Sequence, residues 1–170
     1  MELKRIIEAI LFVSPRPVTL RGLFKKIEGC SIKDVENALN ELTKEYNYSD
    51  RAIEVVQVSG GFQMRTRIEF KDWIKRFVRE KDVELTKSVL ETLATIAYKQ
   101  PVTKKEVDAI RGVDSSRAIK HLLNKRLIEI AGRDGDIGKA ITFRTTGRFL
   151  EVYGLNSIED LPTLRELESI

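Results

Sequence analysis

Apolar residues in the first part of the chain recur at helical spacing, and turn-forming residues separate the resulting segments. From residue 3 to 13 an apolar run predicts a helix, which ends at Ser14 because a residue before proline is pushed out of the helical conformation. Thr19 and Ser31 follow as N-cap residues, and they predict a short helix to about residue 27 and a longer one to Tyr46. The first part of the chain is therefore predicted to form three helices, and a capping residue or a proline marks an end of each.

Two β-rich runs follow these helices. Residues 53–58 and 62–67 flank Ser59-Gly60-Gly61, a combination that is typical of a hairpin. The second half repeats the order, because Pro17-Val18-Thr19 matches Pro101-Val102-Thr103 at an offset of 84 residues. Its predicted elements are helices from Thr86 to about Tyr98, from Thr103 and from Ser115 to Arg126, and strands at 127–131 and 140–145.

Three helices followed by a two-stranded hairpin are typical of a winged helix. The predicted fold class is therefore α+β, mainly helical, with two tandem winged-helix domains. We place the N-terminal domain at residues 1–80, the C-terminal domain at 85–155 and a short acidic tail at 156–170. Just before the boundary, Phe70, Trp73, Ile74, Phe77 and Val78 form an amphipathic helical pattern. We expect this face to pack onto the first domain's core, and a binding surface is the alternative.

The helices at 3–13 and 86–98 carry more apolar surface than one small domain requires. On a helical wheel their apolar residues span about 200°, whereas a surface helix needs a stripe of roughly 100°. A domain of roughly 70 residues has little further material to cover the surplus. We therefore expect a partner to bury at least one of these helices; the alternative is that both are central core helices.

Composition excludes several classes of function. Cys30 and His121 are the only residues of their kinds, so neither an internal disulfide nor a four-ligand zinc site can form from them. The loop at 135–140 fails the phosphate-binding pattern, because Arg133 and Ala140 replace the required glycine and hydroxyl. We expect no catalytic, cofactor-binding or metal-binding residues. We also expect no membrane span and no signal peptide, and hence a cytoplasmic protein.

Charge bears on nucleic-acid binding. The net charge is +4, from 30 Lys and Arg against 26 Asp and Glu, and it is spread over both halves. The helix expected from Ser115 nevertheless exposes a face with no acidic residue, and its candidate contacts to a DNA backbone are Arg117, Lys120, Lys125 and Arg126. The equivalent first-half helix mixes Lys33 and Lys44 with two glutamates. Weak backbone contact and a merely solvated basic face both remain open.

The second half also resembles a known family. The residues that carry the resemblance are Leu90-Glu-Thr-Leu-Ala-Thr-Ile-Ala-Tyr-Lys-Gln-Pro-Val-Thr103, Ile110-Arg-Gly-Val113, Tyr153-Gly-Leu155 and, in the first half, Gly60-Gly-Phe-Gln-Met-Arg-Thr-Arg67. They are similar to segregation and condensation protein B, over nearly the whole chain. The resemblance implies a non-enzymatic adaptor that dimerises mainly through its N-terminal domains. It also implies binding to the central segment of the kleisin subunit, segregation and condensation protein A.

Through the kleisin, such an adaptor would act indirectly on the SMC ATPase, in chromosome condensation and segregation during cell division, at the nucleoid. For this chain we expect a dimer interface at Leu3, Ile6, Ile7, Ile10 and Phe12. We expect a kleisin-binding surface at Leu90, Leu93, Ile96, Ala97, Tyr98, Lys99, Gln100 and Pro101. DNA contact is expected to be weak or indirect. The alternative function is a winged-helix transcriptional regulator that binds DNA.

Overall fold

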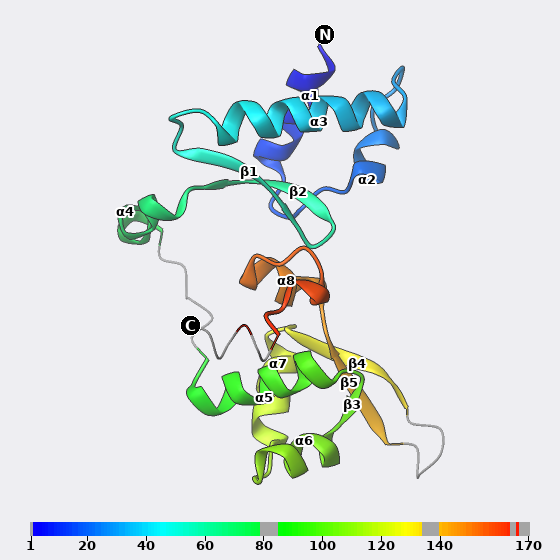
Figure 1. Ribbon diagram of the computed structural model, residues 1–170, viewed down its shortest axis with the longest axis vertical. Helices are drawn as coiled ribbons and strands as arrows, with labels where there is room; N and C mark the ends of the chain where they lie inside the picture. The colour runs from blue at the N-terminus through cyan, green and yellow to red at the C-terminus, as the bar shows by residue number, and fades with distance from the viewer. Residues whose placement is uncertain (1, 79–84, 134–139, 164–165, 167–170) are drawn as a thin grey trace. The chain divides into compact units, whose positions relative to one another are not determined.

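The computed structural model describes residues 2–78, 85–133, 140–163 and 166 (Figure 1). The chain forms two compact units, one of Met1–Glu80 with Gly154–Ile170 and one of Lys81–Tyr153. Each unit combines helices with a small antiparallel sheet, and the α+β winged-helix class predicted from the sequence is confirmed.

The first unit begins with three helices and a hairpin. Its elements are α1 (Leu3–Val13), α2 (Leu20–Phe24), α3 (Ile32–Asn47), β1 (Ile53–Val58), β2 (Gly61–Thr66), the 3-10 turn η1 (Ile68–Phe70), α4 (Lys71–Phe77) and, near the C-terminus, the 3-10 turn η2 (Ile158–Asp160). Ser31 starts α3 with a capping box, in which its hydroxyl accepts from the Asp34 N–H and the Asp34 carboxylate accepts from the Ser31 N–H. The core forms where Ile7 and Leu11 of α1 pack with Leu39 of α3.

The hairpin is fastened to α3 by one arginine. Arg67, directly after β2, donates from its guanidinium to the backbone oxygens of Tyr46 and Asn47 at 3.0 Å each, of Ser49 at 3.3 Å and of Arg51 at 2.9 Å. These bonds serve carbonyls at the end of α3 and in the following turn, where helical partners run out. Arg67 is the last residue of the Gly60–Arg67 segment that carries the family resemblance, and its role in this structure is to bind these carbonyls.

The C-terminal segment belongs to the first unit, which the sequence did not anticipate. The hairpin turn places Ser59 and Gly60 at positive φ, and their N–H groups point outward from the sheet ladder. The Leu155 carbonyl accepts from the Ser59 N–H at 2.9 Å, and the Asn156 side-chain oxygen accepts from the Gly60 N–H at 3.0 Å. Residues past 153 therefore complete the hydrogen bonding of the first wing.

The second unit repeats the helices and hairpin. Its elements are α5 (Lys87–Lys99), β3 (Val102–Thr103), α6 (Lys104–Arg111), α7 (Ser116–Asn124), β4 (Ile128–Arg133), β5 (Ile141–Thr145) and α8 (Gly147–Tyr153). The sheet order is β3-β5-β4. Val102 pairs with Phe143 of the wing just as Val18 pairs with Phe62 in the first unit, and Thr19 and Thr103 cap the helices that follow. The two halves that repeat in the sequence therefore also share these strand pairings and helix caps in the structure.

Candidate functional site

Helix α1 divides the predicted dimer residues between core and surface. Ile7 is fully buried, and Leu3 and Ile10 pack against the same core, so Ile7 is a correction to the expected interface. Ile6 is half-buried. Phe12 is 71% exposed and its neighbour Val13 73%, so the apolar surface available to a partner lies at the C-terminal end of the helix.

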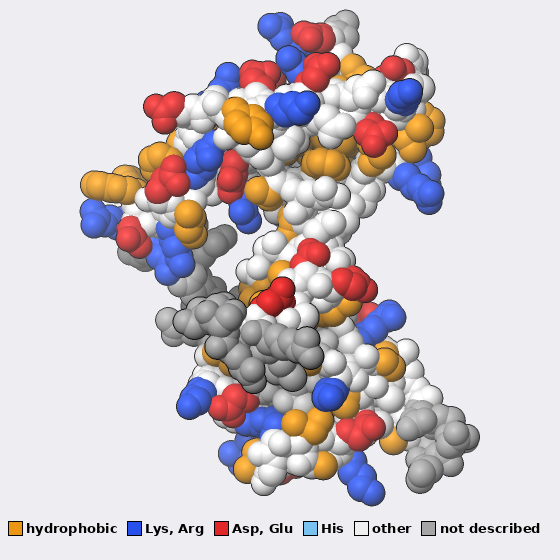
Figure 2. All heavy atoms as spheres, viewed as in Figure 1, with side chains coloured by type: hydrophobic (Ala, Val, Ile, Leu, Met, Phe, Trp, Pro, Cys, Tyr) orange, Lys and Arg blue, Asp and Glu red, His pale blue; other side chains and the backbone are white. Residues whose placement is uncertain are grey.

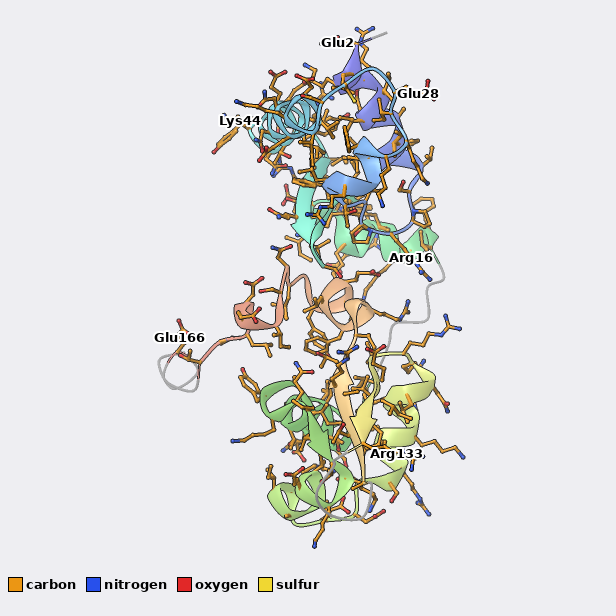
Figure 3. All side chains as sticks on the ribbon, turned by 90° about the vertical axis from the view of Figure 1, so that its right-hand side faces the viewer. Glu2, Arg16, Glu28, Lys44, Arg133 and Glu166 are labelled. Atoms are coloured by element: carbon orange, nitrogen blue, oxygen red, sulfur yellow. The ribbon has the colours of Figure 1, made fainter. Side chains whose placement is uncertain are left out.

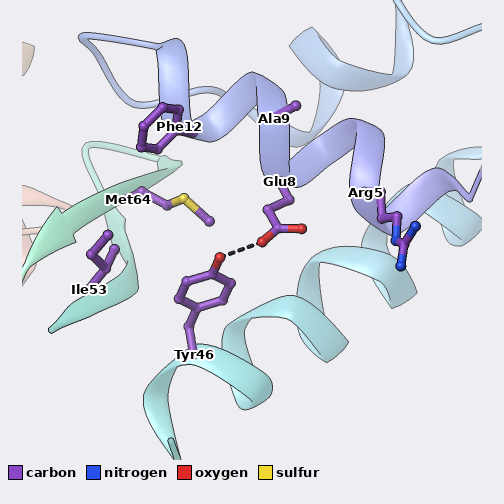
Figure 4. Close-up of a pocket in the computed structure, with 7 residues that line it drawn as sticks. All are labelled: Arg5, Glu8, Ala9, Phe12, Tyr46, Ile53 and Met64. Carbon is purple, nitrogen blue, oxygen red and sulfur yellow. Dashed lines mark hydrogen bonds between the residues drawn. The ribbon is translucent and has the colours of Figure 1, made fainter. Parts of the chain in front are cut away.

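A pocket of about 260 Å³ opens beside Phe12 (Figure 4). Its lining residues come from α1, the end of α3 and both strands of the hairpin: Arg5, Glu8, Ala9, Phe12, Tyr46, Ile53 and Met64. The Tyr46 hydroxyl donates to a Glu8 carboxylate oxygen, and that bond, together with burial, raises the pKa of Tyr46 above its usual value of 10.0. Tyr46 and Glu8 therefore satisfy each other, Arg5 pairs with Glu2 at 3.8 Å, and most of the other lining residues are apolar.

The aromatic face of helix α4 is exposed, contrary to the expectation from the sequence. The predicted packing of its aromatic face onto the first core is wrong, because Trp73 is 62% exposed and Phe77 87%. Hydrophobic side chains are accordingly visible over α4 in the space-filling view (Figure 2). The Arg76 guanidinium lies over the Trp73 ring at 4.8 Å from its centroid, a cation–π contact on the surface. The helix is seven residues long, and none of its residues is fully buried.

Helix α5 divides the predicted kleisin-binding residues in the same way. Leu93, Ile96 and Ala97 are buried in the second unit, where α5 packs against α6, α7 and β5, so these three positions are corrected to core. Leu90 is 43% exposed and Tyr98 44%, and exposed Ala94 lies between them at four-residue spacing. We call Leu90, Ala94 and Tyr98 the α5 stripe.

The three residues after Tyr98 have different environments. Lys99 and Pro101 are exposed, and the Gln100–Pro101 peptide bond is cis. The Gln100 side-chain oxygen accepts from the N–H of Thr145 at 2.6 Å and from its hydroxyl at 2.9 Å. Gln100 therefore ties α5 to β5, and its amide oxygen is committed to the fold.

The predicted basic residues gather at α7 and the turn behind it. Arg117, Lys120 and Arg126 are exposed and Lys125 is half-buried. The exposed face of α3 carries the mixture of charges that the sequence predicts, and its Lys44 points away from the first unit (Figure 3). Only the second unit thus presents a basic third helix.

Within the described ranges, no group of three His, Cys, Asp or Glu side chains is arranged to hold a metal ion. No helix within those ranges is long and apolar enough to cross a bilayer. What the described residues offer is apolar surface at α1, α4 and α5 and a basic face at α7.

Residues 5–164 match the profile of a family described as segregation and condensation complex subunit ScpB. The chain belongs to this family. A segregation and condensation protein B from Syntrophotalea carbinolica is 41% identical over 170 residues, which cover 100% of this chain and 86% of that protein. Another, from Alkaliphilus oremlandii, is 39% identical over 97% of this chain and 89% of that protein. The resemblance seen in the sequence is therefore confirmed, and with it a place among subunits of the segregation and condensation complex.

Two solved structures are also similar. A crystal structure of ScpB from Mycobacterium tuberculosis is 38% identical, covering 91% of this chain and 96% of that chain, with a TM-score of 0.43. A dimer of a ScpB N-terminal domain, complexed with a ScpA peptide, is 26% identical, covering 44% of this chain and 93% of that chain, with a TM-score of 0.40. The family assignment rests on the sequence matches.

Sequence reasoning missed the α1 pocket and the exposure of α4. The pocket joins residues as far apart as Arg5 and Met64, so no local pattern contains it. For α4 the amphipathic pattern predicts a helix but does not tell whether another element covers Trp73 and Phe77.

Proposed function

We propose that this protein is a non-enzymatic adaptor, a homodimer that binds the central segment of the kleisin subunit, segregation and condensation protein A. Through the kleisin it acts on the SMC ATPase in chromosome condensation and segregation, in the cytoplasm at the nucleoid. The observation that carries the proposal is the match to the family over residues 5–164. Exposed apolar side chains on both units give it a physical basis, because such surface is normally covered by a partner.

We assign the two apolar regions to different partners. The end of α1, with Phe12, Val13 and the adjoining pocket, contacts a second copy of the chain. The α5 stripe binds a kleisin helix, because side chains four residues apart on one helix form a ridge that an amphipathic helix can pack against. The half-exposed state of Leu90 supports this assignment, since its side chain is anchored in its own unit while one side remains open.

The test separates the two assignments. At micromolar concentration the free chain should show a dimer mass by light scattering, and Phe12→Ser should show a monomer mass. Leu90→Ala should keep the dimer mass but lose capture of the kleisin segment. Tyr48→Ser, at an aromatic side chain exposed outside both regions, is the control and should change neither result. A monomeric free chain would refute the dimer, and undiminished capture by Leu90→Ala would refute the role of the α5 stripe.

The regulator alternative predicts a different result. A transcriptional regulator binds one DNA sequence selectively at physiological salt and does not need a kleisin. The adaptor captures the kleisin segment and shows no sequence selectivity on DNA. Selective DNA binding without kleisin capture would replace the adaptor with the regulator.

A further inference from the structure

The exposed face of α7 carries two cations and no acidic residue. Ala118, Ile119 and Leu122 are buried on one side of the helix. With about 100° between successive residues, Arg117 and Lys120 lie on the opposite side. Lys125 and Arg126 continue the face in the turn that follows, and no acidic residue occurs from Ser115 to Arg126. Four cations thus lie together on one edge of the second unit; we call them the α7 basic face.

Among the described residues these four cations have no salt bridge to a carboxylate, whereas three other cations of the unit are paired. Lys104 is bound by Asp108 and Asp114 at 2.5 Å each, Arg111 by Glu91 at 3.0 Å, and Arg144 by Glu129 at 2.8 Å. The nearest acids along the chain are Asp114, three residues before Arg117, and Glu129, three residues after Arg126. The oxygens of Asp114 are engaged by Lys104 and Ser116, and Glu129 is engaged by Arg144. The positive charge of the face is therefore left for an external anion.

The turn at the end of this face is held in place. Arg126 adopts a positive φ of 56°, and its carbonyl accepts from the Thr146 hydroxyl at 2.6 Å. Arg148, exposed two residues beyond Thr146, adds a fifth cation on the adjoining chain segment. A fixed turn removes the cost of ordering the backbone on binding, and only the side chains then lose conformational freedom.

The first unit provides an internal comparison. Its α3 occupies the equivalent place, but the two cations Lys33 and Lys44 are outnumbered there by four exposed acids, Asp34, Glu36, Glu41 and Glu45. The same arrangement of helices folds with an acidic third helix. The fold therefore does not require the basic face of α7.

We infer that the α7 basic face binds the phosphate backbone of duplex DNA without reading its sequence. From Arg117 to Lys125 the face extends about 12 Å, at a rise of ~1.5 Å per residue, and duplex DNA carries one phosphate charge per roughly 1.7 Å of its axis, so several phosphates fall within its length. Four phosphate contacts predict that log affinity falls with log salt at a slope of about −3.6. Between 50 and 200 mM salt the affinity should then fall about 150-fold. This site is separate from the α5 stripe, and the inference stands whether or not the kleisin proposal holds.

The test measures fluorescence anisotropy of a labelled duplex, with the full chain, across this salt range. Arg117→Gln with Lys120→Gln should lower the slope to about −1.8, so that the same salt change weakens binding only about 12-fold. Lys33→Gln with Lys44→Gln removes the same charge from α3 and should leave both slope and affinity within about twofold of the unmodified chain. Both pairs are exposed, so circular dichroism should be unchanged.

Three results would overturn the inference. One is an unchanged slope in the α7 variant, and another is equal weakening by the α3 variant, which would reduce the effect to overall charge. The third is a strong preference for one DNA sequence, which would mean contacts to base edges. Retention of kleisin capture by the α7 variant would distinguish failure here from failure of the adaptor proposal.

Discussion

Leu90 and Leu93 lie one helical turn apart on α5 and provide a matched test of which side of the helix is core. Leu93 is 2% exposed, whereas Leu90 is 43% exposed. Truncating a fully buried leucine to alanine costs about 2–5 kcal/mol, because it removes packed atoms and leaves a cavity. At Leu90 roughly half the side chain is already in solvent, so Leu90→Ala should cost about 1 kcal/mol, half of the roughly 2 kcal/mol for burying a whole leucine.

The assay is thermal unfolding of each variant followed by circular dichroism. For a unit of this size each 1 kcal/mol shifts the midpoint by roughly 4–8 °C, so Leu93→Ala should lower the transition of the second unit by about 8–40 °C. Leu90→Ala should lower it by less than about 8 °C and still abolish kleisin capture. Equal destabilisation by the two substitutions would refute the division of α5 into a core side and a partner side.

Three further predictions follow from local contacts. Arg67→Ala should destabilise the first unit by about 2–4 kcal/mol, because it leaves the carbonyls at the end of α3 without this donor. Arg67→Lys should not restore the lost stability, because an ammonium group cannot reproduce the geometry of the guanidinium. A loss under about 0.5 kcal/mol, measured by urea unfolding, would contradict this prediction. Hydrogen bonds from the N–H and hydroxyl of Thr103 hold the pKa of Glu106 below its usual 4.5 in the folded protein. The ionised carboxylate therefore stabilises the second unit at pH values above the pKa that Glu106 has in the unfolded chain. This stabilisation is lost as the pH falls through the lower pKa of the folded state. Glu106→Gln should therefore flatten the acid limb of stability against pH, and an unchanged limb would show that the cap contributes nothing. Removing residues 154–170 should destabilise the first unit through the uncovered N–H groups of Ser59 and Gly60, a change that urea unfolding would detect and that an unaltered midpoint would contradict.

Local chemistry explains why much of the fold was predictable. The caps at Thr19, Ser31 and Thr103 depend on residues within three positions, and the helices begin where those caps predict. The hairpins follow from short runs of alternating residues around turn formers. The winged-helix class therefore came from signals that lie entirely within single segments of the chain.

The candidate surfaces were less predictable because exposure depends on distant elements. A helical wheel shows that α5 has a broad apolar arc, but only the packing of α6, α7 and β5 assigns Leu93 to the core and leaves Leu90 at the edge. The amphipathic pattern of α4 was read correctly as a helix, yet nothing in a seven-residue segment indicates that Trp73 has no partner element. The contacts of Leu155 with the first wing join residues 96 positions apart, beyond any periodicity.

Binding of the kleisin's central segment, measured by isothermal titration calorimetry at several temperatures, tests the central claim most directly. The account predicts saturable binding to the unmodified chain with a negative heat-capacity change, because the apolar α5 stripe leaves water on association. It also predicts that Leu90→Ala removes this binding and that Tyr48→Ser preserves it. An absence of binding heat at every temperature, with the chain folded and its mass unchanged by the kleisin segment, would contradict the adaptor function.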